Sequence, residues 1–536
     1  MIANRLNWAV ALVTLAIGTL WTLPPTNTCL PHSVNLLTAT VSDLTAHLSS
    51  GRFTSVQLVQ ECIARIQHHD KNGLRLNSVL SLVSRDQLRS TATRIDSERQ
   101  KATRLSALFG VPVLVKDNFA TEPSLGLPTT GGVVAFANVT AKHDAAAVLQ
   151  LRRAGAIILG KTNLDELAGF KGDNLGSGWS KLGGKTRSAY TFESPCGSSG
   201  GSAVAVSAGF VPVALGSEIA GSITCPASHA ALFGFVASRG LVSSHGLLPG
   251  SASFDRPGIL AKSTVDVASV LGIIAQANVP ISDDAVWADF RIGRADPDFF
   301  GKIHGTYHEK NGEMEMYRAV SEAMNRMEAL GAVVNMNASS SARLIPQAWE
   351  EMLRIIRHEM KSNFPEFFVD TSDAVAKSLP ELVKYNKEHW SDALQKDGLH
   401  FPQGQEVLER SIEESLDDAQ YTEIMGKLHA LAVTEGIEHA FKTHKVDFLV
   451  TPGWSWMSVY SAIAGALMGT VPLGTYPNGR PFGLTFVAPK GQDAKLLQLM
   501  QFYEKAFPPR RVPSSMSSIF ANLYFTFRND FPPYDS

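Results

Sequence analysis

Apolar positions along this chain follow two alternating patterns, one typical of helices and one of buried strands. After position 54 they recur every three or four residues, which predicts an amphipathic helix, at Val56, Val59, Cys62, Ile63 and Ile66. Thr54-Ser55-Val56-Gln57 has the form of a capping box and marks the start of this helix. Similar patterns predict a helix that Asp144 caps and that ends near Arg153, and another from Ser263 to Ile274.

Short, continuously apolar runs separate these helices. One run begins at Phe109 and ends at Lys116, and another spans 156–159. Runs of this length without polar alternation are typical of strands buried on both faces. The alternation of helix and buried strand therefore predicts an α/β fold, with a sheet covered by helices on both sides.

The second half of the chain has a different pattern. Residues 281–440 are more charged and mostly helical in periodicity, most clearly over 316–330 and 347–360. Beyond them, 446–450 is predicted to be a buried strand, and 470–476 and 482–487 are predicted to form a hairpin across Asn478-Gly479. A closing helix is expected over 492–506, followed by a peripheral tail, 511–536.

The first 28 residues stand apart from the rest. Arg5 precedes an apolar run, 8–21, and Pro24-Pro25 ends it. This run is short for a bilayer span but suits the core of a signal peptide. An uncleaved signal anchor stays open as an alternative, since no clear small-x-small cleavage site follows, and only in that case is a membrane a partner. A secreted or secretory-pathway protein is expected.

Two acceptor triplets for N-linked glycans follow this leader. They are Asn138-Val139-Thr140 and Asn337-Ala338-Ser339, and both lie in segments expected to face solvent. Such triplets also arise by chance. Asn138 and Asn337 are therefore candidate glycosylation sites of a secreted glycoprotein.

Composition narrows the class of function. The chain is 44% hydrophobic and 18% charged, with a formal net charge of −2, so no basic surface for nucleic acid is indicated. Four cysteines are too few for a disulfide scaffold, and whether Cys196 bonds to Cys225 stays open. No His-Glu-x-x-His or Cys-x-x-Cys pattern occurs, so neither a metal nor a cofactor is expected.

Two Gly/Ser clusters carry the candidate chemistry. Gly197–Gly201 and Gly216–Ser222 flank an apolar segment, 203–215. A flexible linker would not enclose a segment that must be buried, so both clusters are expected to be fixed in space. Glycine allows backbone N–H groups to approach a ligand closely. The hydroxyl of Ser222 beside such donors would suit acyl transfer.

A base for this chemistry is offered by Lys116, at the end of its apolar strand. A lone lysine at such a position commonly extends its amine to water. If the amine is instead buried, its pKa falls and the neutral amine can accept a proton.

These motifs together resemble the amidase signature family of serine hydrolases. The similarity covers about residues 40–510 and is densest over 105–275, with 281–440 as the variable helical region. The matching motifs also include Leu127-Pro128-Thr129-Thr130-Gly131, the segment 153–163 and Ser238-Arg239-Gly240-Leu241-Val242-Ser243. The resemblance implies one unit of α/β/α layers around a large mixed sheet. It also implies an amidase that hydrolyses a carbon–nitrogen bond of a small-molecule amide, or an ester. The oligomeric state stays open.

The resemblance also implies the roles of individual residues. Ser222 would be the nucleophile that forms an acyl-enzyme, Ser198 the bridging serine on a cis Gly197–Ser198 peptide bond, and Lys116 the final base. The backbone N–H groups of Ile219, Ala220, Gly221 and Ser222 would form the oxyanion hole.

The chain departs from the family pattern around its nucleophile. Ala220 replaces a glycine, Thr224 replaces an arginine, and Glu218 is longer than the usual acidic residue. Loss of the arginine argues against a substrate that carries a carboxylate there. These changes leave two alternatives to hydrolysis: acyl transfer to another nucleophile, or a weakened relative that binds a ligand.

Ser199 offers a competing nucleophile. Gly197-Ser198-Ser199-Gly200-Gly201 satisfies the G-x-S-x-G pattern of the nucleophile elbow, which requires a strand before it. The preceding segment, 190–195, is a poor strand. The elbow hypothesis also leaves Lys116 and the second cluster without a role.

Overall fold

The computed structural model describes residues 34–173, 176–248, 250–279, 281, 284–295, 310–340, 345–389 and 404–516. The predicted leader, 1–28, lies outside the described residues, as does the tail beyond 516. Within these ranges, no helix combines the length and the apolar character that a membrane span requires.

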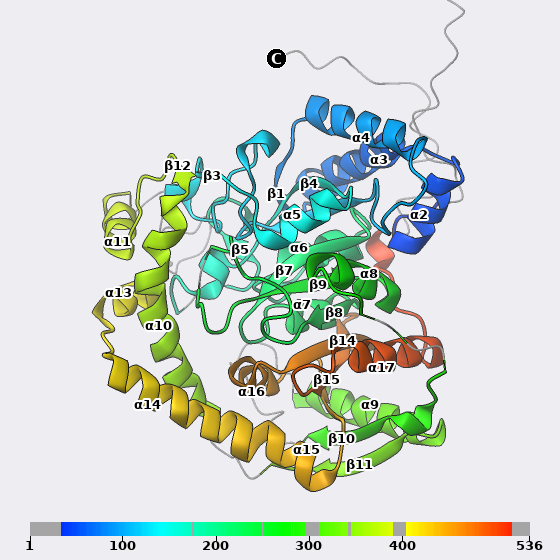
Figure 1. Cartoon of the computed structure of the whole chain (residues 1–536), viewed down its shortest axis with the longest axis vertical. Helices are drawn as coiled ribbons and strands as arrows, with labels where there is room; N and C mark the ends of the chain where they lie inside the picture. Colours follow the sequence, from blue (N-terminus) through cyan, green and yellow to red (C-terminus); the bar gives the residue numbers. More distant parts are fainter. Residues whose placement is uncertain are drawn as a thin grey trace, which may run out of the picture.

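A large mixed sheet forms the centre of the described structure (Figure 1). Its 11 strands follow the order β1 (Val79–Leu82), β4 (Ile157–Thr162), β2 (Pro112–Lys116), β7 (Val213–Glu218), β9 (Arg256–Ala261), β8 (Phe233–Val236), β14 (Leu467–Thr475), β15 (Pro481–Ala488), β13 (Phe448–Pro452), β10 (Arg291–Ala295) and β11 (Val333–Ala338). Parallel pairs lie on both sides of an antiparallel centre. The predicted α/β architecture with a mixed sheet is confirmed.

Two parallel neighbours, β2 and β7, determine where the active-site segments meet. Every residue of both strands is buried, as expected for continuous apolar runs. Val115 pairs with Leu215, so the two strands run in register. Lys116 ends β2 and Glu218 ends β7. The turn that carries Ser222 therefore leaves the same edge of the sheet as Lys116.

Helices cover both faces of the sheet. A Cβ on Gly234 of β8 would contact Ala227 of α7 (Thr224–His229), whereas one on Gly469 of β14 would contact Met500 of α17 (Asp493–Ala506). Gly469 pairs with Phe235, the residue after Gly234. Since successive side chains of a strand point to opposite faces, α7 and α17 lie on opposite sides.

The other helices of the core pack against the sheet or against one another. The helix α6 (Gly200–Ser207) packs on β7, and α8 (Thr264–Ile274) packs between α5 (Ala146–Arg153) and α17. The N-terminal layer consists of α2 (Val41–Ser49), α3 (Ser55–Ile66) and α4 (Arg85–Arg99). Shorter elements are the strand pairs β3 (Thr140–Ala141) with β12 (Thr371–Ser372) and β5 (Trp179–Ser180) with β6 (Gly184–Lys185). There are also a π-helical stretch, Gln67–Lys71, and the 3-10 helices Pro123–Leu125, Val134–Phe136, Glu166–Gly169 and Trp287–Asp289.

One predicted helix cap is confirmed and another is wrong. Thr54 caps α3, accepting the N–H of Gln57 at 3.2 Å in a complete capping box. Asp144 does not cap α5, whose N-cap is Ala145. The carboxylate of Asp144 instead accepts the N–H of Glu122 at 2.8 Å and pairs with Arg152, so it binds the helix to a neighbouring loop.

The variable region, 281–440, is largely helical, as predicted, but its described residues also contribute three strands: β10 and β11 in the large sheet, and the short β12 that pairs with β3. Its helices are α9 (Lys310–Ala329), α10 (Ile345–Val369), α11 (Leu379–Glu388), α13 (Glu406–Glu413) and α14 (Asp418–His429), which continues through a π-helical stretch, Ala430–Ile437, into α15 (Glu438–His444). The strands β10 and β11, absent from the prediction, extend the sheet to its edge. Figure 1 shows α10, α11, α13 and α14 as an outer layer along one side of the core.

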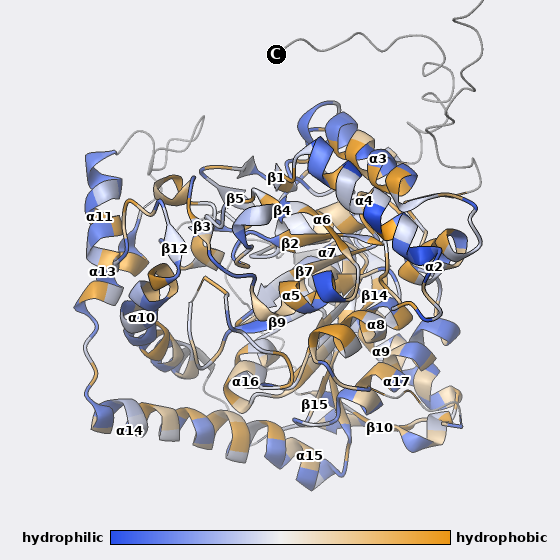
Figure 2. Cartoon of the chain, turned by 45° about the horizontal axis from the view of Figure 1, so that its top comes forward, coloured by the Kyte–Doolittle hydropathy of each residue, from blue (hydrophilic) through white to orange (hydrophobic). Residues whose placement is uncertain are grey.

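The outer helices are amphipathic, with hydrophobic and hydrophilic residues alternating along α14, while the central strands are mostly hydrophobic (Figure 2).

A set of hydrogen bonds to one carboxylate joins this layer to the core. The carboxylate of Glu359 on α10 accepts hydrogen bonds from the hydroxyls of Ser251, Ser253 and Tyr421. The loop 250–255 is thereby attached to the outer helices.

The C-terminal elements match their prediction closely. The strands β14 and β15 form the expected antiparallel hairpin, and β13 and α17 lie within a few residues of their predicted bounds. The connection from β13 leads to α16 (Met457–Ala464) through a loop that contains Trp454.

Candidate active site

Lys116, Ser198 and Ser222 meet in one chain of hydrogen bonds. The amine of Lys116 donates to Oγ of Ser198 at 2.7 Å, and Oγ of Ser198 donates to Oγ of Ser222 at 2.8 Å. Lys116 ends β2, Ser198 precedes α6, and Ser222 lies between β7 and α7. The fold thus brings together the three residues that the sequence singled out.

The segment that carries Ser198 is tightly held. Its peptide bond with Gly197 is cis, as the family resemblance implied. A Cβ on Gly197 would collide with the carboxylate of Asp165, whose N–H donates to the carbonyl of Ser198 at 3.2 Å. The N–H of Ser199 donates to the carbonyl of Ser222 at 3.2 Å. These contacts fix the two serine segments relative to each other.

Burial controls the charge of Lys116. Its side chain is fully buried, and desolvation lowers the pKa of its amine from 10.5 to about 8. Three carboxylates, those of Asp165, Asp255 and Glu218, act in the opposite direction and raise this pKa. The neutral amine is therefore accessible near physiological pH.

A second hydroxyl holds the amine in place. Oγ of Ser217 accepts from Nζ of Lys116 and from Nδ2 of Asn118, both at 3.0 Å. An ammonium group can only donate hydrogen bonds. Once Lys116 loses a proton, it can accept from Ser198 while it still donates to Ser217. The arrangement thus allows the direction of the Lys116–Ser198–Ser222 chain to reverse.

The turn before Ser222 differs from the predicted oxyanion hole at one donor. The carboxylate of Glu218 accepts the N–H groups of Gly221 and Ile223, so the N–H of Gly221 is already bonded. Among the described residues, the backbone N–H groups of Ile219, Ala220 and Ser222 have no hydrogen-bond acceptor. These three donors remain available to a ligand.

The alanine in this turn is accommodated. Ala220 has a negative backbone φ and is half-buried against the core, whereas Gly221 has φ 108°. The left-handed region is thus needed at Gly221 and not at Ala220. The substitution of glycine by Ala220 therefore introduces no backbone strain. Thr224 is buried at the start of α7.

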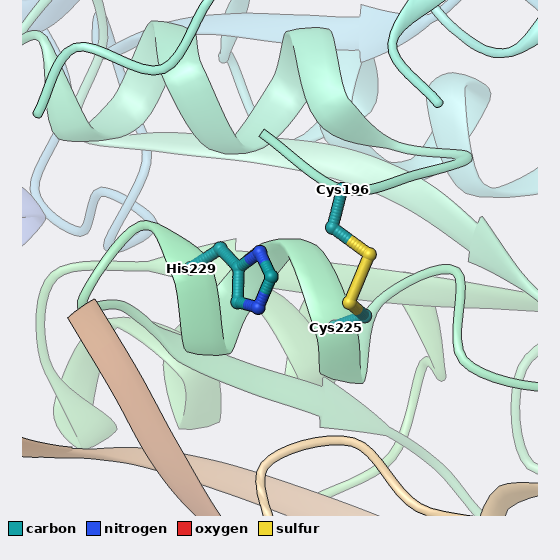
Figure 3. Close-up of side chains that lie close together, drawn as sticks. All are labelled: Cys196, Cys225 and His229. Carbon is teal, nitrogen blue, oxygen red and sulfur yellow. A yellow bond between two sulfur atoms is a disulfide. The ribbon is translucent and has the colours of Figure 1, made fainter. Parts of the chain in front are cut away.

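A buried disulfide bond joins the two segments that flank Ser198 and Ser222 (Figure 3). Cys196 bonds to Cys225, which answers the question that the sequence left open. The bridge links the residue before Gly197 to the helix that follows Ser222. His229 lies beside it on α7, but sulfur atoms engaged in a disulfide are not thiolate ligands for a metal.

Ser199 has a structural position. It is fully buried, its hydroxyl donates to the carbonyl of Ser217 at 3.2 Å and accepts the N–H of Ser217 at 3.3 Å. The segment 190–195 forms turns and bends and contains no strand. The strand–turn–helix geometry of a nucleophile elbow is therefore absent at this site.

Several site residues escaped the sequence analysis. Asn118 and Ser217 would have been candidates had β2 and β7 been recognised as parallel neighbours, because both lie at the same ends of those strands. Asp165 and Asp255 come from loops that carry no motif for such a role. Trp454, whose indole lies against Gly221, follows a strand far along the chain and gave no signal.

Comparison with known proteins shows the family of this chain. A family model described as Amidase matches residues 57–497. A peptide amidase from Stenotrophomonas maltophilia is 32% identical, with a TM-score of 0.77 over 89% of this chain and 98% of that one. A probable amidase of Arabidopsis thaliana is 29% identical over 90% of this chain and 93% of its own length. One subunit of a glutamyl-tRNA(Gln) amidotransferase from Endomicrobium trichonymphae is 27% identical over 88% and 97%, respectively.

The chain belongs to the amidase family. It is an amidase, and its reaction is the hydrolysis of a carbon–nitrogen amide bond.

The close contact at Gly221 leads to a testable prediction. In Gly221→Ala, the new Cβ would collide with Nε1 of Trp454, and the alanine would have to adopt a left-handed backbone conformation. We expect amidase activity to fall at least about 100-fold, because a shift of about 1 Å at a reacting group has such an effect. Gly240→Ala is the matched control, since Gly240 also has a positive φ but no atom lies within 4 Å of its Cβ position.

Both variants should lose stability by about 1–2 kcal/mol from the left-handed backbone alone, as measured by chemical denaturation. Steady-state kinetics should show a large loss only for Gly221→Ala. Equal activities of the two variants would contradict the tight packing of the turn.

Proposed function

We propose that this amidase cleaves its substrate through an acyl-enzyme on Ser222, with Ser198 as the proton carrier and Lys116 as the base. The observation that carries this proposal is the continuous chain of hydrogen bonds from the buried amine to Oγ of Ser222. A hydroxyl needs an adjacent base to become a nucleophile, and no other titratable side chain is hydrogen-bonded to either serine within the described structure.

Protons move along this chain in both directions during one turnover. Neutral Lys116 takes the proton of Ser198 while Ser198 takes that of Ser222, and Oγ of Ser222 bonds to the substrate carbonyl carbon. The carbonyl oxygen becomes an oxyanion near the N–H groups of Ala220 and Ser222. As the carbon–nitrogen bond breaks, the proton returns along the same path to the leaving amine. Water then attacks the ester by the same route and releases the acid and Ser222.

The proposed substrate is a small neutral amide. The peptide amidase of Stenotrophomonas maltophilia, a relative over nearly its full length, supports a carboxamide. Charge in the site supports the same choice: Asp165, Asp255 and Glu218 surround Lys116, and Thr224 stands where the family has an arginine. A carboxylate next to the reacting carbonyl would be repelled by this set of acidic groups.

A second prediction tests the three roles. Ser222→Ala should abolish turnover and labelling by a fluorophosphonate probe. Ser198→Ala and Lys116→Ala should slow acylation by about 10²–10⁴-fold, the usual contribution of proton transfer, and leave the circular dichroism spectrum unchanged. Ser199→Ala is the control and should stay within about 10-fold of the parent, because its hydroxyl bonds only to the backbone.

Mass mapping of the labelled digest identifies the nucleophile directly. An adduct on Ser199 would disprove the assignment and support the elbow hypothesis. An absence of any adduct on the folded protein would favour the weakened, ligand-binding alternative. Product analysis with added amines separates hydrolysis from acyl transfer.

A third prediction concerns pH. Because the amine must be neutral to accept a proton, kcat/KM should rise with pH through a single deprotonation near pH 8, the pKa to which burial lowers Lys116. Below this pKa the rate should fall about tenfold per pH unit. In Lys116→Ala the residual activity should lack this step. A profile of the variant that retains the step would assign the titration to another group.

We also propose that the chain is a secreted glycoprotein. Three features support this: the leader, the disulfide between Cys196 and Cys225, which is typical of oxidising compartments, and two exposed acceptor residues, Asn138 and Asn337. Asn337 lies on β11, at the edge of the sheet.

A fourth prediction follows from this compartment. In the native host, the mature chain should begin between about Leu23 and Ser33, and glycosidase treatment should increase its mobility on a gel. Asn138→Gln and Asn337→Gln, singly and together, would assign the shift to a site. A chain that begins at Met1, shows no shift and fractionates with the cytosol would refute the secretory proposal alone.

A further inference from the structure

Trp454 lies against the turn that carries Ser222. It follows β13 in the loop to α16, and its side chain is half-buried. If a Cβ is built on Gly221, the nearest atom is Nε1 of Trp454, with Cδ1 at 2.9 Å and Cε2 at 3.5 Å. The indole therefore presents its N–H edge, and not its face, to the residue before the nucleophile.

The loop that carries Trp454 is rigidly attached to the strands and helix around it. Gly453 donates its N–H to the carbonyl of Gly483 at 2.8 Å and accepts from the hydroxyl of Thr485 at 3.0 Å. Gly483 in turn donates to the hydroxyl of Ser228 on α7 at 2.7 Å. Since α7 follows directly on Ser222, the indole is held in a fixed position relative to the nucleophile.

The indole N–H has no acceptor. An indole nitrogen can only donate hydrogen bonds, and the half-buried side chain of Trp454 leaves this donor open to a ligand. Within the described residues, no hydrogen bond from Nε1 of Trp454 is present, whereas the neighbouring N–H of Gly221 donates to Glu218. The N–H of Gly221, a predicted oxyanion donor, is thus already hydrogen-bonded, and the indole N–H of Trp454 lies beside it without an acceptor.

We propose that the indole N–H of Trp454 is a donor to the oxyanion that forms on the substrate carbonyl, next to the backbone N–H groups of Ala220 and Ser222. This inference rests on the proposed role of Ser222 as the nucleophile. Charge on the carbonyl oxygen grows as Oγ of Ser222 bonds to the carbon, so a donor fixed at that position binds the transition state more strongly than the substrate. Trp454 would then be a catalytic residue that comes from outside the serine clusters.

The test removes the N–H and keeps an aromatic ring. In Trp454→Phe, kcat should fall about 100-fold, the usual effect of losing one such donor, while KM changes less than about threefold. The pH step near 8 should stay in place, because Lys116 is unaffected. Trp454→His restores a ring N–H and should recover part of the lost kcat. Trp456→Phe, in the same loop, is the control and should retain kcat within about threefold.

Several outcomes would overturn the inference. The first is a Trp454→Phe variant whose kcat stays within about threefold of the parent. The second is a change confined to KM, which would make the ring a binding surface only. The third is an equal loss of kcat in Trp456→Phe, which would indicate a disturbed loop. Fluorophosphonate mapping of the parent separates this inference from the proposed function. If the parent is labelled at Ser222 and Trp454→Phe is fully active, only the role of Trp454 fails. If the parent is not labelled at Ser222, the proposed function itself fails.

Discussion

The burial of one amine, that of Lys116, is the constraint on which the rest of the site depends. Moving an ammonium group out of water is costly unless it is hydrogen-bonded and compensated by opposite charge. Here the hydroxyls of Ser198 and Ser217 accept from the amine, and three carboxylates at longer range stabilise its charged form. The pKa therefore falls only part of the way, to a value at which both protonation states can be populated.

The carboxylates need partners of their own, and these partners organise the surrounding loops. Burial raises the pKa of Asp165 and of Asp255, and backbone N–H groups that donate to them oppose this rise: Gly178 for Asp165, Gly250 and Ser251 for Asp255. The loops that carry Asp165 and Asp255 are thus held in place by hydrogen bonds to these carboxylates. The effect extends outward, because Ser251 also donates its hydroxyl to Glu359 on α10. The outer helices are in this way connected to the environment of Lys116.

Much of the fold could be predicted from local patterns, and the reasons for success and failure are physical. The apolar run before Lys116 and the capping box at Thr54 predicted β2 and α3, because burial and capping act over a few residues. Asp144 failed as a cap because its carboxylate is engaged by an ion pair with Arg152 and by the N–H of Glu122 in a neighbouring loop. The strand β11 was missed because an edge strand is only half-buried; its first residue, Val333, is 57% exposed.

The residues of the candidate site also fall into two groups, those that local sequence patterns predicted and those that they did not. Lys116, Ser198 and Ser222 lie in motifs dense in glycine and serine or at the end of an apolar run, and such motifs are visible in one dimension. Asn118, Ser217 and the three carboxylates become neighbours only when parallel strands end at a common edge. Asn118, Asp165 and Asp255 are ordinary in residue type, so no local pattern marks them, whereas Ser217 and Glu218 lie within the second Gly/Ser cluster but carry no local signal of their interaction with Lys116.

Glu218 shows how one side chain changes the donors available to the reaction. Its carboxylate accepts the N–H of Gly221 and, at the start of α7, the N–H groups of Ile223 and Thr224. The first N–H groups of a helix have no partner within the helix, so one side chain satisfies both the turn and the helix start. This arrangement holds Ser222 between a buried strand and a fixed helix, but it engages the N–H of Gly221, one of the donors expected in the oxyanion hole. A donor from another part of the fold can then take over, and Trp454, held by β15 and α7, is our proposed donor because its Nε1 lies against Gly221.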